Sequence, residues 1–118
     1  MDTEELKRRT KIFGLSVIRL VESLPRTKTA DIIGRQLLRS ATSVGANYRA
    51  VCRARSKADF VSKVGVVEEE ADESLFWLEL LHEVKAGDAE CVTQLLREAN
   101  ELTAIFAASE KTAKAIPR

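Results

Sequence analysis

The sequence has 118 residues, of which 45% are hydrophobic and 31% charged, and its formal net charge is +1. This length fits one domain and is sufficient to bury a core. No stretch approaches the ~20 consecutive apolar residues that span a bilayer, and the acidic start Met1-Asp2-Thr3-Glu4-Glu5 is unlike a secretory signal. We therefore expect one soluble, cytoplasmic domain over residues 1–118, with no membrane partner.

The composition predicts helices throughout. Only five Gly and two Pro interrupt a chain rich in Ala, Leu, Glu, Lys and Arg, which favour helix. Thr3 and Ser56 are suitable N-caps, Pro25 ends the first apolar pattern, and Gly87-Asp88 separates the last two. Helices are expected at about residues 3–24, 29–55, 57–86 and 89–113, with the chain after Ala107 fraying.

Each predicted helix carries an apolar stripe at helical spacing. Four helices with short connections favour antiparallel neighbours, so the predicted fold is all-α, an antiparallel up-down-up-down four-helix bundle. Gly45, within the second helix, is interpreted as a point of close approach between helices. The four stripes comprise Leu6, Phe13, Val17, Leu20 and Leu24; Ile33, Leu37, Ala41, Val44, Tyr48 and Val51; Phe60, Val64, Val67, Ala71, Leu75, Leu78 and Leu81; and Val92, Leu95, Ala99, Leu102 and Phe106.

The near-neutral net charge conceals a strong segregation. Residues 25–57 hold eight basic residues and one acidic residue, whereas residues 68–83 hold seven acidic residues and no Lys or Arg. An advance of about 100° per residue places four arginines opposite the core stripe of the second helix. We call them the arginine ridge: Arg35, Arg39, Arg49 and Arg53.

The side of the third helix opposite its core stripe is unusually apolar. A solvated helix face rarely carries several large apolar residues, and such clusters typically mark an interaction surface. On the first helix, Leu15 and Ile18 also lie away from the core stripe. A partner is therefore expected at these positions. The outer face of the third helix consists of Val66, Glu69, Glu73, Phe76, Trp77 and Leu80.

Our hypothesis is that this outer face packs on a different surface of a second copy, with the arginine ridge as a candidate acceptor. Opposite charges would fix the register, and contacts between unlike surfaces close into rings where the geometry permits. The competing interpretation is that Arg39 and Glu73 pair within one chain, since antiparallel helices would bring them to similar height.

The sequence offers little catalytic chemistry. Its one histidine, His82, is expected on the inward side of the third helix. Cys52 and Cys91 are expected to be buried free thiols, with a disulfide between them as the alternative. The carboxylates of residues 68–73 spread around the helix and do not converge on a metal site. Residues 43–47 lack a phosphate-loop pattern. We expect no enzyme, no catalytic residue, no metal and no cofactor.

Three segments together resemble a bacterial four-helix bundle family. Its founding members are encoded by intervening sequences within 23S ribosomal RNA genes and are often labelled S23 ribosomal proteins. The resemblance rests on SVGANYRA, CRARS, EEADES and WLELL within residues 34–81, on FGLSVIRLVESLP (13–25), and on LLREANELTAIFAASEKTAK (95–114).

The resemblance implies an antiparallel four-helix bundle that assembles as a five-fold ring. It also implies a relation in fold to accessory proteins of diversity-generating retroelements, basic pentamers that bind a reverse transcriptase and nucleic acid. We expect a homopentameric binding module with RNA, DNA or a nucleic-acid-processing protein as partner; the alternative is an adaptor ring that docks another protein only. The sequence pI of about 7.8 requires any phosphate-binding surface to be segregated. Its candidate residues are Arg35, Arg39, Arg49 and Arg53, with Arg8, Lys11 and Arg19.

Overall fold

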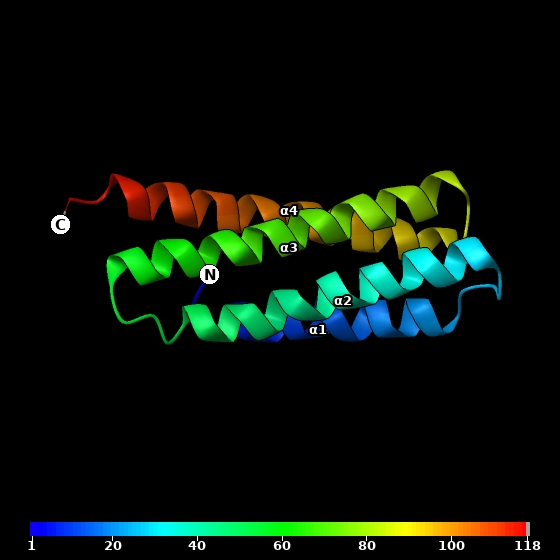
Figure 1. Ribbon diagram of the computed structural model, residues 1–118, viewed down its shortest axis with the longest axis horizontal. Coiled ribbons are helices and arrows are strands. Elements are labelled where there is room, and N and C mark those ends of the chain that lie inside the picture. Colours follow the sequence, from blue (N-terminus) through cyan, green and yellow to red (C-terminus); the bar gives the residue numbers. More distant parts are fainter. Residues whose placement is uncertain (118) are drawn as a thin grey trace.

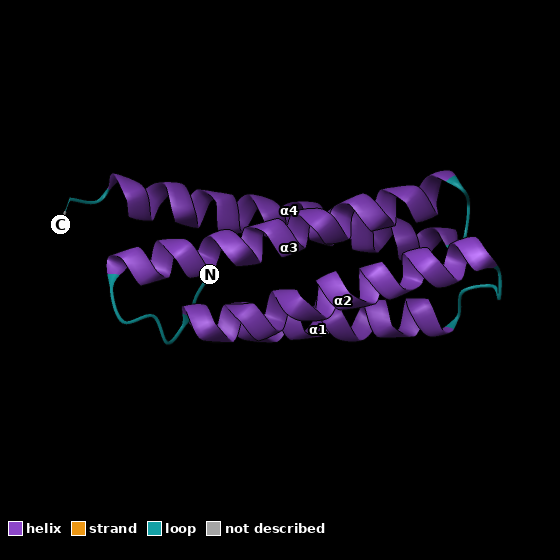
Figure 2. Ribbon diagram, viewed as in Figure 1, coloured by secondary structure: helices purple, strands orange, loops and turns teal. Residues whose placement is uncertain are grey.

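The computed structural model describes residues 1–117 and confirms the predicted four-helix bundle (Figure 1). The helices are α1 (Thr3–Glu22), α2 (Lys28–Val51), α3 (Lys57–Glu83) and α4 (Ala89–Ala115). Consecutive helices run antiparallel and are joined by short loops at the two ends of a rod measuring 51 × 23 × 20 Å (Figure 2).

Each helix begins where a side chain accepts a hydrogen bond from the backbone N–H three residues later, which satisfies one donor of the first turn. The predicted caps Ser56 and Asp88 are confirmed. The predicted cap Thr3 is wrong, because Asp2 has the extended backbone and its carboxylate accepts from the Glu5 N–H. Thr27 caps α2, one residue before its first turn.

The predicted helix ends were less accurate than the starts. Helix α1 ends at Glu22 because Pro25 disfavours helical backbone at Leu24. Helix α2 ends at Val51, four residues early, since Ser56 must be extended to cap α3. Helix α3 ends at Glu83, after which Lys85 and Gly87 take positive φ values of 58° and 82°. Helix α4 continues to Ala115, so the expected fraying after Ala107 is wrong.

The core is formed by the predicted stripes. Leu37, Val67, Leu78 and Leu102 are completely buried, and Leu24, Phe60 and Leu75 are half-buried at its edge. A polar link crosses this core, because the buried Ser74 hydroxyl donates to the Ser40 hydroxyl at 2.9 Å and ties α3 to α2. Helices α2 and α4 both pack extensively on α3, whereas α1 packs mainly on α2 and only lightly on α4.

Candidate functional site

Helices α1 and α2 approach closely around two glycines. A Cβ added to Gly45 would lie 3.4 Å from the Thr10 carbonyl oxygen, and one added to Gly14 would lie 3.8 Å from the Ala41 carbonyl oxygen. The prediction that Gly45 marks a close helix approach is therefore confirmed. Beside this crossing, the surface carries a groove of about 440 Å³ whose floor includes Thr10, Gly14 and Gly45.

The walls of this groove combine apolar and basic side chains. Leu15 and Ile18 of α1 are 41% and 40% exposed along it, and no carboxylate belongs to its lining within residues 1–117. Apolar surface surrounded by charges of one sign favours an occupant that is itself apolar and oppositely charged. We call it the basic groove; its four cations are Lys7, Lys11, Arg49 and Arg53.

The structure divides the arginine ridge into two halves. All four arginines are exposed as predicted, but Arg39 forms ion pairs with Glu70, at 3.5 Å, and with Glu73 of α3. The intrachain pairing between Arg39 and Glu73 is thus confirmed. Arg35 pairs with Asp31 one turn earlier. The ion pairs found in residues 1–117 leave out Arg49 and Arg53, which line the basic groove.

The outer face of α3 is only partly as predicted. Val66 and Phe76 are 42% and 49% exposed, as a candidate docking surface requires. The expectation that Trp77 and Leu80 lie on an outward face is wrong, because both are half-buried against the core. Phe76 packs on Trp77 edge to face, with ring centroids 5.0 Å apart.

Glu73 is also half-buried, and two donors hold its carboxylate. The Trp77 indole N–H donates to Glu73 Oε2 at 3.1 Å, and Arg39 binds the same oxygen from α2. The indole hydrogen bond, followed by the guanidinium, lowers the pKa of Glu73, although partial burial opposes the shift. This cluster fixes Trp77 and closes the seam between α2 and α3.

Phe76 is the most exposed apolar residue of this face, and acids surround it. Its helix neighbours at i−4, i−3 and i+3 are Asp72, Glu73 and Glu79, and side chains at these spacings are adjacent on a helix surface. Asp72, Glu79 and Glu69 are all exposed. We call Val66, Glu69, Asp72, Phe76 and Glu79 the acidic apolar face; it is the charge complement of the basic groove.

The other predicted basic positions do not join this groove. Arg8 and Arg19 are exposed on α1, but neither lines the groove, and Arg19 lies beside a separate hollow between α1 and α4. Three of the seven candidate nucleic-acid-binding residues, Lys11, Arg49 and Arg53, thus share one surface with the candidate interface residues Leu15 and Ile18.

Two expectations about individual residues are wrong. His82 is exposed, because it lies one residue beyond the inward Leu81 and points out of the last turn of α3. Cys52 is exposed at the end of α2, while Cys91 is half-buried; both are free thiols.

In the part of the chain that the structure describes, no group of three His, Cys, Asp or Glu side chains is placed to hold a metal ion. Nor is any helix of residues 1–117 apolar enough to cross a bilayer.

An ion pair that the sequence pattern does not predict joins α1 to α4. Arg9 donates from Nε and one terminal nitrogen to the two oxygens of Glu98, both at 2.7 Å, and its hydrogen bond with Glu101 is 3.1 Å long. Glu98, the largest influence, raises the pKa of Arg9 against a smaller effect of burial. Periodicity alone does not reveal this pair, because it depends on how α1 and α4 pack.

Comparisons with known proteins agree with this fold. A crystal structure from Bacteroides thetaiotaomicron, described as a protein of unknown function from the S23 ribosomal protein family, superposes with a TM-score of 0.83 at 29% sequence identity. The match covers 94% of this chain and 99% of that one. No curated protein sequence matches. The sequence model of the 23S rRNA-intervening sequence proteins matches residues 4–108, and the chain therefore belongs to the 23S rRNA-intervening sequence protein family.

Proposed function

We propose that the chain is a non-enzymatic binding module that assembles from identical copies. In each contact, the acidic apolar face of α3 on one copy enters the basic groove between α1 and α2 of the next. Such a contact joins two unlike surfaces, so it leaves a free groove at one end and a free face at the other until a ring closes. A homopentamer is the ring that we propose.

The observation that supports this proposal is the complementarity of the two surfaces. Phe76 stands 49% exposed among carboxylates, while Leu15 and Ile18 stand exposed among Lys7, Lys11, Arg49 and Arg53. Apolar burial would supply most of the affinity, since exposed ion pairs contribute only ~0–1 kcal/mol each. The charges would select the partner and its register.

The arrangement limits how the proposed assembly could contact nucleic acid. Lys11, Arg49 and Arg53 would be covered by the neighbouring α3, and Arg35 and Arg39 already form ion pairs within the chain. This leaves Arg8 and Arg19 on α1 as the exposed cations of the predicted set that belong to none of the ion pairs found in residues 1–117. We propose RNA, DNA or a protein–nucleic-acid complex as the ligand of that remaining basic surface. The alternative function, an adaptor that docks another protein, requires no phosphate contact.

The first test is the solution mass of the purified protein by light scattering at low and high salt. One copy weighs 13.1 kDa, so a pentamer would give about 65 kDa. We expect this mass at low salt and a shift toward smaller species at high salt, because salt screens the rim charges. A mass of one copy in both conditions contradicts the assembly.

A second test separates nucleic acid from the adaptor function. Binding of a fluorescent single-stranded RNA should weaken steeply with salt through counterion release, and Arg8→Glu with Arg19→Glu should reduce it without changing the oligomer mass. If the assembled protein binds neither single-stranded nor duplex RNA or DNA at low salt, the result would support the adaptor function instead.

A further inference from the structure

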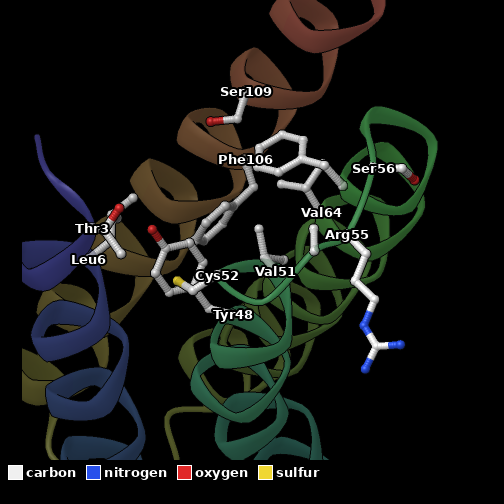
Figure 3. Close-up of a pocket in the computed structure, with 12 residues that line it drawn as sticks. Thr3, Leu6, Tyr48, Val51, Cys52, Arg55, Ser56, Val64, Phe106 and Ser109 are labelled. Carbon is white, nitrogen blue, oxygen red and sulfur yellow. The ribbon is translucent and has the colours of Figure 1, made fainter.

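The end of the bundle where α2 passes into α3 contains a second hollow, with a volume of about 560 Å³ (Figure 3). It arises because α2 ends at Val51, and the chain from Cys52 to Ser56 then loops outward before α3 begins. Protein interiors are packed nearly as densely as organic crystals, and small-molecule sites typically measure 300–1,000 Å³. The size of this hollow fits a compact organic molecule.

The inner wall of the hollow is apolar and partly aromatic. Val64 and Phe106 are each only 1% exposed, and Val51 is 4% exposed. The rings of Tyr48 and Phe106 lie 5.5 Å apart and are tilted by 47°, and the half-buried Phe60 also lines the space. Aromatic rings pack favourably against such tilted faces and edges. The wall therefore favours a ring-containing occupant.

A small number of polar groups surround this apolar wall. Figure 3 shows the Tyr48 and Thr3 hydroxyls on one side of the hollow, with the Cys52 thiol next to them. The Tyr48 side chain is only 7% exposed. Burial, followed by the nearby Cys52 thiol, raises the pKa of Tyr48 to about 12. Its phenol therefore stays protonated at neutral pH and can donate a hydrogen bond.

The charge of the lining argues against an ionic ligand. Arg55 is the one charged residue among the lining residues of the described chain, and Figure 3 shows its guanidinium pointing away from the hollow. An anion or cation would lose hydration here without gaining a charged partner, which is costly. A neutral molecule would lose less.

We propose that this hollow binds a small neutral aromatic molecule carrying one hydrogen-bonding oxygen. The ring would pack against Phe60 and Phe106, and the oxygen would accept a hydrogen bond from the Tyr48 hydroxyl. The exposed Cys52 thiol stands at the rim, so an occupant would cover it. This site shares no residue with the basic groove or the acidic apolar face, so its test is independent of assembly.

The test uses the full chain and 4-methylphenol as the probe. We expect saturable binding with a dissociation constant on the order of 1 mM, measured by saturation-transfer NMR, since so small a ligand has few atoms to contribute affinity. Benzoate, which is anionic at neutral pH, should bind at least tenfold more weakly. The same 4-methylphenol concentrations should slow alkylation of Cys52, followed by mass spectrometry, but leave alkylation of Cys91 between α1 and α4 unchanged.

Two variants test whether 4-methylphenol binds in the hollow. Tyr48→Phe should weaken 4-methylphenol binding about three- to tenfold by removing one hydrogen bond. Cys52→Phe, at an exposed position, should fill the rim and abolish binding, with circular dichroism as the check on folding. Non-saturable signals, or equal affinity in the wild type and Cys52→Phe, would overturn the site. Equal affinity in the wild type and Tyr48→Phe would overturn the proposed hydrogen bond.

Discussion

The two halves of the arginine ridge are both exposed, but their surroundings differ. Arg39 is held by Glu70 and Glu73 across the seam with α3, where Trp77 also binds Glu73. Arg49 lies about three turns further along α2, and Arg53 lies two residues beyond the end of that helix. Both line the basic groove beside the crossing of α1 and α2. The first half is used inside the fold, whereas the second half is available to a partner.

This difference shows that a charged helix face need not have one role along its length. Helix α3 supplies the carboxylates that neutralise Arg39, but α1 opposes Arg49 and Arg53 with Lys7 and Lys11. Lys7 pairs with Glu4 at 3.4 Å, but the other three cations of the groove belong to none of the ion pairs found in residues 1–117, and a nearby opposite charge would relieve their mutual repulsion. An incoming acidic surface would provide that charge.

The largest expected effect comes from reversing the charge of Arg49 and Arg53, the two ridge arginines that line the basic groove. The double substitution Arg49→Glu and Arg53→Glu should raise the dissociation constant of the assembly at least tenfold, because it sets like charges against the acidic apolar face. Light scattering across a dilution series measures this change. Adding Glu69→Lys and Glu79→Lys in the same chain should restore assembly by exchanging both signs.

The matched control for this reversal is Arg35→Glu, on the same helix. Arg35 pairs with Asp31 and does not line the groove, so this single change should leave the oligomer mass unaltered. Equal loss of assembly in Arg35→Glu and the double variant would mean that overall charge, and not the groove, controls association.

A second prediction compares two adjacent arginines of α1: Arg9, which pairs with Glu98, and Arg8, which belongs to none of the ion pairs found in residues 1–117. Arg9→Met removes both hydrogen bonds to Glu98, whose side chain is 26% exposed, and should lower the free energy of unfolding by about 1–3 kcal/mol. Arg8→Met, at an exposed position, should change it by less than about 0.5 kcal/mol. Urea denaturation measures both.

Both variants should be compared in the Arg49→Glu, Arg53→Glu background, so that dissociation of the assembly does not add to the unfolding free energy. If Arg9→Met and Arg8→Met are equally stable there, the link between α1 and α4 contributes nothing measurable.

The third prediction concerns the pH dependence of the ion pair between Arg39 and Glu73. Because the folded pKa of Glu73 is lowered, its contribution to stability is complete above the ordinary glutamate pKa of about 4.3 and is lost as pH falls through the folded value. Trp77 is the only tryptophan, so its fluorescence reports the loss of the indole hydrogen bond. We expect a transition with a midpoint below pH 4.3.

Arg39→Gln removes one of the two groups that lower this pKa, so the fluorescence midpoint should move to higher pH. An unchanged midpoint would show that the guanidinium has no influence on Glu73 in solution. Lys63→Gln, whose partner is Asp59 on the same helix, is the control and should leave the midpoint where it is.

The smallest effect is expected in the floor of the basic groove. Gly14→Ala should raise the free energy of unfolding by up to about 1 kcal/mol, since alanine favours helix and its methyl group would meet atoms no closer than 3.8 Å. Gly87→Ala should lower it instead, because φ is +82° there and the methyl group would lie 3.0 Å from Leu20 Cδ1. Thermal unfolding measures both the expected increase and the expected decrease in stability.

Sequence periodicity predicted the helices and nearly all of the core, because burial on one helix face depends mainly on spacing along the chain. It failed at His82, since a 100° rule cannot place a residue at the edge of a stripe, and at Trp77 and Leu80. A wide side chain on the border of a face can turn toward the core when the neighbouring helix leaves room. Such packing depends on how neighbouring helices are placed in three dimensions, which the periodicity of one helix does not reveal.

The site was predicted in parts that the sequence could not combine. The sequence suggests the arginine ridge both as an acceptor for a second copy and as a nucleic-acid-binding surface, and it suggests Leu15 with Ile18 as a separate interface, because a helical wheel treats each helix alone. Only the crossing of α1 and α2 brings Lys11, Leu15 and Arg49 around one groove. The pairing of Arg39 with Glu73 was an explicit alternative, since it followed from antiparallel register, and it was correct.

The glycine crossing has a consequence for how this fold could diversify. The floor of the basic groove is largely backbone and small residues, including Gly14, Gly45 and Ala46, while its chemical character comes from long side chains at the edge. Substituting those long side chains would alter the preferred ligand at little cost to folding, because exposed positions tolerate change. The same scaffold could thus acquire acidic, basic or apolar specificities through a few surface substitutions, while the crossing itself stays fixed.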